Sequence, residues 1–166
     1  MVSRLWDFEE MSENVVFMDE NKFWEIIDKL DWSHQGDDDA MLEPAVNLLS
    51  EMSVEDIYGF EETMALKLYK LDTMKHAMNI GEGAYVNDEV YFSIDEFLYA
   101  RCVVVANGRE LYEKVLSDPS EFPKDLEFEA LLFIAQTAYK LKTEKDWEYS
   151  PLNDYETYGN KEEWSG

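Results

Sequence analysis

The sequence is poor in cysteine, histidine and basic residues, and it contains no long apolar run. Cys102 is the single cysteine among 166 residues, which excludes an internal disulfide and gives no sign of an oxidising compartment. His34 and His76 are the only histidines, too few for a histidine-rich metal site. No stretch approaches the roughly 18 apolar residues that a membrane-spanning helix requires, and no signal-peptide pattern opens the chain. We therefore expect a cytoplasmic protein.

The motifs of the common enzyme classes are also missing. The chain contains no phosphate-binding loop, no glycine-rich dinucleotide turn and no nucleophile elbow. It has neither the paired histidines of a zinc protease, nor a pair of cysteines at metal-binding spacing, nor an EF-hand loop. The sequence therefore favours a protein that is not an enzyme, and it predicts no cofactor and no metal.

The charge of the chain is strongly one-sided. It carries 38 acidic residues against 14 lysines and arginines, a formal net charge of −24. A field of this sign repels nucleic-acid phosphates and anionic membrane surfaces, so we expect no direct binding to either. A basic protein would be attracted instead. Solubility alone is the alternative meaning of the charge.

The acidic residues are not evenly spread. No lysine or arginine occurs between Lys29 and Lys67, an interval rich in aspartate and glutamate. If these side chains share a face, they form an acidic patch, although a solvated surface is the more common meaning of such a run. The predicted patch consists of Asp37, Asp38, Asp39, Glu43, Glu55 and Asp56.

Length and apolar content predict one mostly α-helical domain. Hydrophobic residues make up 46% of the chain and aromatic residues 14%, which is too much for a disordered protein. Apolar residues recur at helical spacing in several segments, which predicts a compact bundle of about five to seven helices. We expect helices over residues 20–30, 44–52, 53–79 with a break near Asp72, 93 to a break at Gly108, 109–116 and 126–142.

Polar residues mark where several of these helices should begin. Asp19 is placed to cap the first helix, and Pro44 suits the first turn of the second. Ser53 with Asp56, and Ser93 with Glu96, have the spacing of capping boxes. Between the helices, the tyrosine- and valine-rich residues 84–92 are compatible with one small β-hairpin.

The two ends of the chain differ from the middle. Residues 1–17 form an acidic N-terminal arm, residues 18–143 the helical domain, and residues 144–166 a C-terminal tail in which aromatic and acidic residues alternate. We expect the tail to pack on its own domain, because exposed aromatic side chains are costly. Ordering on a partner is the alternative.

Arg101 is the first candidate site residue. It lies on the same helical stripe as Phe97 and Val104, so its charge must be paired or must reach a cleft. Asp72, Asp95 and Glu96 are the candidate partners. A buried ion pair that joins two helices is the expected role, and an anion-binding arginine in a pocket is the alternative.

Asp72 and His76 form the second candidate. They are four residues apart and can meet across one helical turn, as in a carboxylate-oriented general base. No recognisable nucleophile accompanies them, so a structural pair is the expected role. Cys102 follows Arg101, whose charge could lower the pKa of the thiol, but a buried and inert cysteine is the expectation.

The residues from Met18 to Asp28 (MDENKFWEIID) resemble the opening of a bacterial domain-of-unknown-function family, number 4240. The resemblance continues through Phe60, Tyr69 and Asp72, and it is clearest from Ser93 to Phe122. The matched residues there are Phe97, Tyr99, Arg101, Gly108, Tyr112, Asp118 and Pro119, followed by residues 131–135, Ala138 and Tyr139. Leu71 and Val103 stand where the family has tryptophans. The resemblance implies a compact helical fold in a bacterial or phage protein, and it implies no activity.

Three functions remain compatible with these features. The first is an acidic intracellular protein-binding module, in its most concrete form an immunity-like protein that neutralises a basic partner. The second is a small-ligand-binding protein or enzyme with a pocket around Asp72, His76, Asp95 and Arg101. The third is a DNA-mimic inhibitor, which would require carboxylates in two regularly spaced rows.

Overall fold

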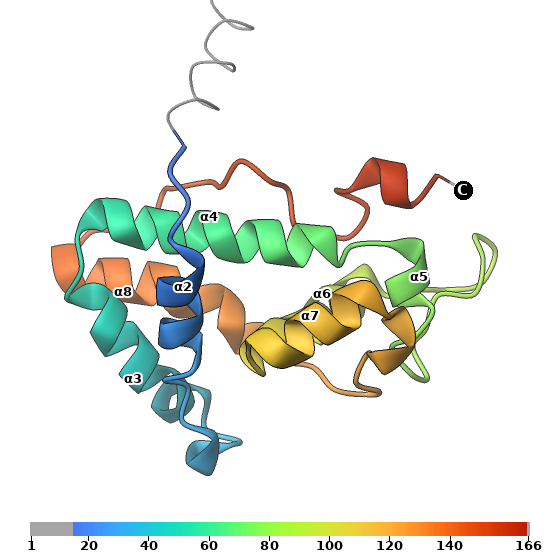
Figure 1. Ribbon diagram of the computed structural model, residues 1–166, viewed down its shortest axis with the longest axis horizontal. Helices are drawn as coiled ribbons and strands as arrows, with labels where there is room; N and C mark the ends of the chain where they lie inside the picture. The colour runs from blue at the N-terminus through green and yellow to red at the C-terminus, as the bar shows by residue number, and fades with distance from the viewer. Residues whose placement is uncertain (1–14, 166) are drawn as a thin grey trace, which may run out of the picture.

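A computed structural model describes residues 15–165 (Figure 1). This part of the chain contains seven α-helices and no β-strand, so the predicted mostly α-helical fold is confirmed. The helices are α2 (Glu20–Ile27), α3 (Asp38–Ser50), α4 (Val54–Lys70), α5 (Met74–Ala77), α6 (Ile94–Ala106), α7 (Arg109–Ser117) and α8 (Ile134–Thr143). Most of the predicted N-terminal arm, residues 1–14, lies outside the described residues.

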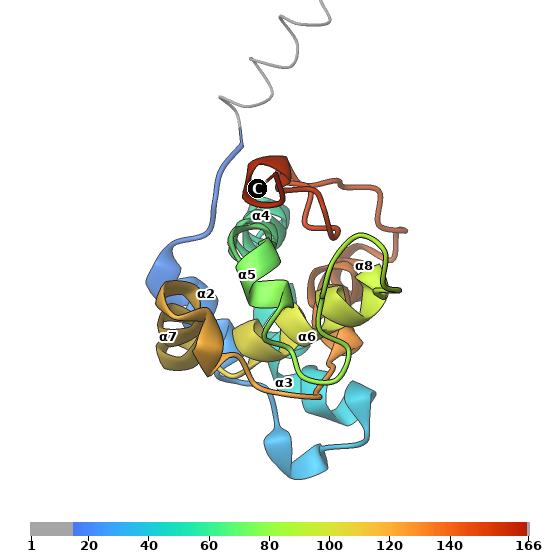
Figure 2. The same ribbon diagram turned by 90° about the vertical axis from the view of Figure 1, so that its right-hand side faces the viewer.

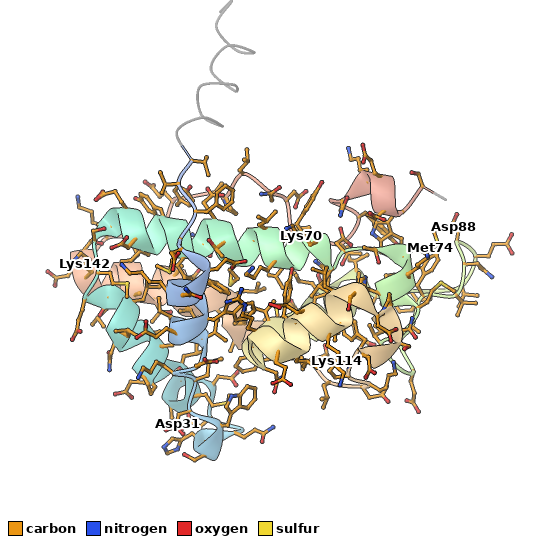
Figure 3. The ribbon with its side chains drawn as sticks, viewed as in Figure 1. Asp31, Lys70, Met74, Asp88, Lys114 and Lys142 are labelled. Carbon is orange, nitrogen blue, oxygen red and sulfur yellow. The ribbon has the colours of Figure 1, made fainter. Side chains whose placement is uncertain are left out.

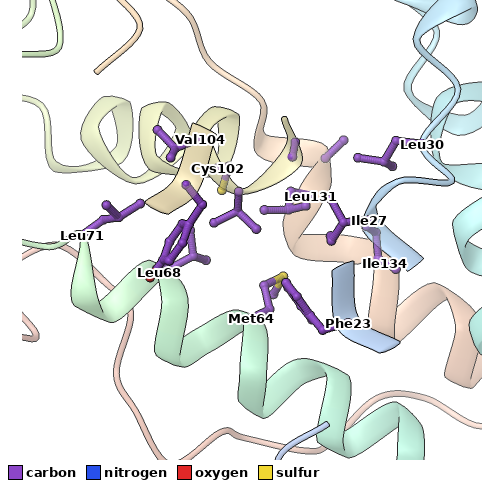
Figure 4. Close-up of a cluster of buried hydrophobic side chains, with 14 of the residues drawn as sticks. Phe23, Ile27, Leu30, Met64, Leu68, Leu71, Cys102, Val104, Leu131 and Ile134 are labelled. Atoms are coloured by element: carbon purple, nitrogen blue, oxygen red, sulfur yellow. The ribbon is translucent and has the colours of Figure 1, made fainter. Parts of the chain in front are cut away.

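Helix α4 is the centre of the arrangement. It runs horizontally along the upper part of the bundle in Figure 1, with α2, α3, α6 and α8 packed along it. Ile57, Phe60, Met64 and Leu68 are fully buried and recur at three- or four-residue steps, which gives α4 a continuous apolar stripe. Figure 4 shows this core, in which side chains from α2, α4, α6 and α8 meet. None of the helices within residues 15–165 has the length and apolar content needed to cross a bilayer.

The predicted helix starts are confirmed where a cap was recognised. Asp19 accepts a hydrogen bond from the Lys22 amide at 3.2 Å, and Ser53 and Asp56 form the complete capping box of α4. The side chain of Ser93 caps α6 by accepting from the Glu96 amide. Each cap satisfies amides that the first helical turn leaves without partners.

Two predicted helix boundaries were wrong. Helix α3 begins at Asp38, six residues before Pro44, because Asp37 accepts from the Ala40 amide and caps an earlier start. Residues 129–133 form a 3-10 turn, and α8 begins only at Ile134. The predicted break near Asp72 is present, since α4 ends at Lys70 and the short α5 begins at Met74.

The predicted β-hairpin at residues 84–92 is also wrong. The Asn87 side chain accepts from the Glu89 and Val90 amides, which makes a local turn without a strand ladder. Val86 and Tyr91, on either side of the turn, are 60% and 88% exposed. Only the ends of the segment, Tyr85 and Phe92, pack on the core, so a strand ladder across its exposed middle would bury little.

Lys67 holds α2 against α4 from inside the bundle. The residue is 8% exposed, and its Nζ lies 2.7 Å from a carboxylate oxygen of Glu20. The same ammonium stands 5.2 Å from the ring centres of both Trp24 and Tyr112. An ammonium over aromatic faces is stabilised by their quadrupoles, so these contacts offset part of its desolvation.

Residues 144–165 lie along α4 and complete the fold. Figures 1 and 2 both show this segment, in red, above α4 on the side away from α3. Tyr149 stacks on Tyr58 with ring centres 4.3 Å apart. Trp164 packs edge-on against Tyr85 and Phe97, at 5.3 Å and 6.0 Å. Trp147, Tyr155 and Trp164 of the tail are therefore partly buried against the core, while Tyr158 remains exposed.

Candidate functional site

Arg101 is fully buried and is held by hydrogen bonds instead of an ion pair. One guanidinium nitrogen donates to the carbonyls of Leu68 and Tyr155 at 2.9 and 2.8 Å, and the other donates to the Thr157 hydroxyl at 3.0 Å. The guanidinium also lies 4.6 Å from the ring centre of Phe97. Burial lowers the pKa of Arg101, while the nearby Asp72 charge opposes this shift. Within residues 15–165, no carboxylate lies within ion-pairing distance of it.

Asp72 is the second buried charge, and it binds the same tail. One carboxylate oxygen accepts from the Tyr158 amide at 3.3 Å and from the Trp164 indole at 2.9 Å, and the other accepts from the Asn160 amide at 3.0 Å. Tyr158 has a positive φ of 77°, which a bulky side chain rarely adopts. The contacts on either side of Tyr158 hold the backbone in this conformation.

Glu62 holds the tail at a third point. Its carboxylate accepts from the Leu152 amide at 2.9 Å and from the Tyr149 hydroxyl. Glu62, Asp72 and Arg101 therefore bind the tail mostly through its main-chain atoms. We call these three side chains the tail clamp. These hydrogen bonds offset part of the cost of burying the three charges, although the buried Nε of Arg101 has no partner among the described residues.

The other predicted site residues do not join the tail clamp in one cleft. His76 is buried, with Nε2 2.8 Å from the Val115 carbonyl and Nδ1 2.7 Å from the Thr73 hydroxyl. A carbonyl only accepts, so Nε2 carries the proton, and burial lowers the pKa of the imidazole. Asp95 is exposed in the first turn of α6. His76 and Asp72 are thus each bonded to different partners.

Cys102 is fully buried in the core. Burial raises the pKa of its thiol to about 12, and the opposing effect of Arg101 is smaller. These surroundings keep the thiol protonated, which agrees with the expectation of a buried and inert cysteine.

Glu61 is a buried acid that the sequence analysis did not single out. It is 4% exposed, and one of its carboxyl oxygens has no hydrogen-bond partner among the described residues. Burial, and then the charge of Glu62, raise its pKa to about 7. The available sequence signal was its position: Glu61, Leu68 and Asp72 lie on one stripe of α4 and the following turn, at spacings of seven and four residues.

The predicted acidic patch separates into two groups. The first group lies at the beginning of α3 and consists of Asp37, Asp38, Asp39 and Glu43. The second group, Glu55 and Asp56, lies at the beginning of α4. The length of α3 separates the two groups, and a helix of that length spans about 20 Å. Asp37 and Asp56 are used as helix caps. Asp38, Asp39 and Glu43 are exposed, and within the described chain none of them forms an ion pair.

A pocket of about 490 Å³ adjoins the first of these groups. It is bounded by the turn before α3, the last turn of α6 and residues 126–128. Trp32 and Phe128 form an aromatic wall, with ring centres 5.9 Å apart, and Asp38 and Glu127 are the acidic residues of the lining. Neither ring was identified from the sequence, because Trp32 and Phe128 are far apart in the chain and share no motif.

The comparison with family models matches residues 18–141 to a family described as "Protein of unknown function (DUF4240)". The chain belongs to this family. No curated protein and no solved structure matches the chain.

The family match ends before the tail begins. Asp72, Arg101 and Glu62 lie inside the matched part of this DUF4240 chain, while every tail atom that they bind lies beyond residue 141. Within residues 15–165, no group of three or more histidine, cysteine or carboxylate side chains is placed to hold a metal ion. The buried polar residues therefore act here on the chain itself.

Replacing Asp72 by asparagine tests the tail clamp. Asparagine keeps the shape but offers one acceptor oxygen to three donors, so we expect the free energy of unfolding to fall by about 2–3 kcal/mol. Asp95→Asn, at an exposed position, should cost less than about 1 kcal/mol. Urea unfolding followed by tryptophan fluorescence measures both, and equal stability of the two variants would contradict the assigned role of Asp72.

The raised pKa of Glu61 predicts a pH dependence of stability. The pKa is 4.5 in an unperturbed glutamate and about 7 in the fold, so between these values the folded chain keeps a proton that the unfolded chain has lost. The free energy of unfolding contributed by this group should therefore decrease as pH rises through that window, by up to about 3 kcal/mol.

Glu61→Gln isolates this contribution because a glutamine cannot titrate. We expect the variant to gain stability relative to the parent chain as pH rises from about 4 to about 8. Denaturant unfolding at a series of pH values measures the difference. Parallel pH profiles for the two proteins would show that Glu61 has an ordinary pKa.

Proposed function

We propose that this DUF4240 protein is a binding module for a basic protein, and that the acidic group at the beginning of α3 is its contact surface. In its fuller form, the proposal is a bacterial, cytoplasmic, immunity-like protein that neutralises a basic partner. The chain's formal net charge of −24 would attract such a partner over long distances and accelerate the encounter.

The observation that carries the proposal is the unpaired state of Asp38, Asp39 and Glu43. Charged residues of the interior, such as Arg101 and Lys67, have partners within the chain, whereas these three carboxylates are exposed and form no ion pair within residues 15–165. Asp39 and Glu43 are four residues apart and thus lie on one face of α3. Like charges so close destabilise a helix slightly, which a basic partner would relieve.

The surroundings of Arg101 give less support to a ligand pocket there. Both terminal nitrogens of its guanidinium are bonded to the chain, and Asp72 is bonded to the tail. A small anion would have to displace the tail to reach them. A DNA mimic is also less well supported, because Asp39 and Glu43 lie on one face of α3 as a single short row of carboxylates, whereas a mimic would require two regularly spaced rows.

The proposal is tested by neutralising the three carboxylates and recovering partners from an extract of the native cells. The variant Asp38→Asn, Asp39→Asn, Glu43→Gln leaves the helix cap Asp37 intact. The parent chain should retain a basic protein at about 50 mM salt and release it at about 500 mM, because salt screens exposed charges. The triple variant should bind the partner at least about tenfold more weakly than the parent chain, a loss of about 1.4 kcal/mol in binding free energy.

A matched control removes the same charge from the other end of the molecule. Glu89, Glu162 and Glu163 are exposed. Figure 3 places Asp31, at the turn before α3, far from Asp88, the neighbour of Glu89. Changing these three glutamates to glutamine should leave retention within about threefold of the parent, since only long-range attraction is reduced. Equal loss in both triple variants would refute a contact surface on α3.

A further inference from the structure

We infer that the pocket beside Trp32 is a receptor for an arginine side chain of the partner. This inference rests on the proposed function and adds to it the chemistry of one contact. The pocket encloses about 490 Å³, and its lining contains two carboxylates, Asp38 and Glu127, and no lysine or arginine. An acidic hollow of this kind fits a cation from outside the chain.

The wall of the pocket suits a flat cation. Trp32 is 40% exposed, and it meets Phe128 at an interplanar angle of 38° with ring centres 5.9 Å apart. The two rings are too close for a group to insert between them, so they offer one continuous aromatic surface to a ligand. A guanidinium stacks on such a surface, and its weak hydration lowers the cost of leaving water.

The polar groups around this wall complete the recognition of a guanidinium. Asp38, at the beginning of α3, and Glu127, in the segment before α8, are the two acidic residues of the lining. Asn107, at the C-terminal end of α6, donates its amide to the Val103 carbonyl at 2.7 Å, which leaves its side-chain oxygen as an acceptor. The C-terminal end of a helix, here that of α6, also carries a partial negative charge. A guanidinium has five donors in a planar fork, and it can use several such acceptors at once.

The apolar part of the lining suits the methylene stem of an arginine. Met41 and Val103, which are 1% and 6% exposed, contribute apolar side chains to the pocket. Arginine buries its stem on apolar surface while its head remains with polar partners. Since Asp39 and Glu43 lie on the adjoining helix α3, an arginine in the pocket would place neighbouring basic residues of the partner over the exposed carboxylates.

The pocket can be tested without the natural partner. The probe is a short capped peptide, Gly-Arg-Gly, and the readout is the NMR signal of the Trp32 indole N–H in the full chain, assigned by its absence in Trp32→Leu. We expect this signal to shift and saturate with the arginine peptide. The same peptide with citrulline, which has nearly the same shape but no charge, should bind at least about tenfold more weakly. A lysine peptide should bind several-fold more weakly than the arginine peptide, because it lacks the planar fork.

Two variants of the chain sharpen the result. Binding to these variants is followed by the backbone amide signals of Gly36 and Phe128, which also line the pocket. Trp32→Phe retains an aromatic face and should bind the arginine peptide within about threefold of the parent, whereas Trp32→Leu should lose about tenfold. An unmoved Trp32 signal, or equal binding of the arginine and citrulline peptides, would overturn the inference. Equal binding of arginine and lysine would overturn the choice of a guanidinium.

The pocket and the proposed function can fail separately. If the native partner is retained by the parent chain and lost by the α3 triple variant, but the arginine peptide does not shift Trp32, only the pocket is disproved. If the peptide binds at Trp32 and the native extract yields no basic partner, the pocket stands and the proposed function fails.

Discussion

The attachment of the C-terminal segment to α4 is the interaction on which the rest of this structure depends. Glu62, Asp72 and Arg101 are buried charges, and each would be very costly without hydrogen-bond partners. The tail supplies most of these partners, from both main-chain and side-chain atoms. In return, its aromatic side chains pack against α4, as Tyr149 does on Tyr58. The helical bundle and the tail are therefore energetically one unit, although the family model ends at residue 141.

This dependence divides the charges of the protein into two classes. The buried class serves the fold: Lys67 joins α2 to α4, and Asp72 and Arg101 hold the tail. The exposed class is mostly acidic and, at the beginning of α3, has no partner within residues 15–165. Arg101 was a candidate because it lies on an apolar stripe, and Asp72 because it lies four residues before His76. In the fold, both residues bind the tail.

Local signals in the sequence were sufficient for the helices and their caps, as Ser53 with Asp56 shows, because capping depends on residues three positions apart. One local signal was overlooked: Asp37 caps α3 six residues before Pro44, which therefore lies inside the helix. Other errors came from tertiary contacts, as at residues 84–92, which form a turn because Val86 and Tyr91 are exposed and have nothing to pack against. The burial of Arg101 was predictable from its stripe, but its partners were not, since Tyr155 and Thr157 are more than 50 residues away. The aromatic wall of Trp32 and Phe128 was hidden for the same reason.

The most direct test of this account is the hydrogen exchange of the Tyr158 and Asn160 main-chain amides, which donate to Asp72. If the tail is part of the folded unit, both amides should exchange about as slowly as the central amides of α4, because both require global unfolding. Exchange at the rate of an unstructured peptide would contradict the account. It would show that the tail leaves α4 readily and that Asp72 and Arg101 are available to a ligand.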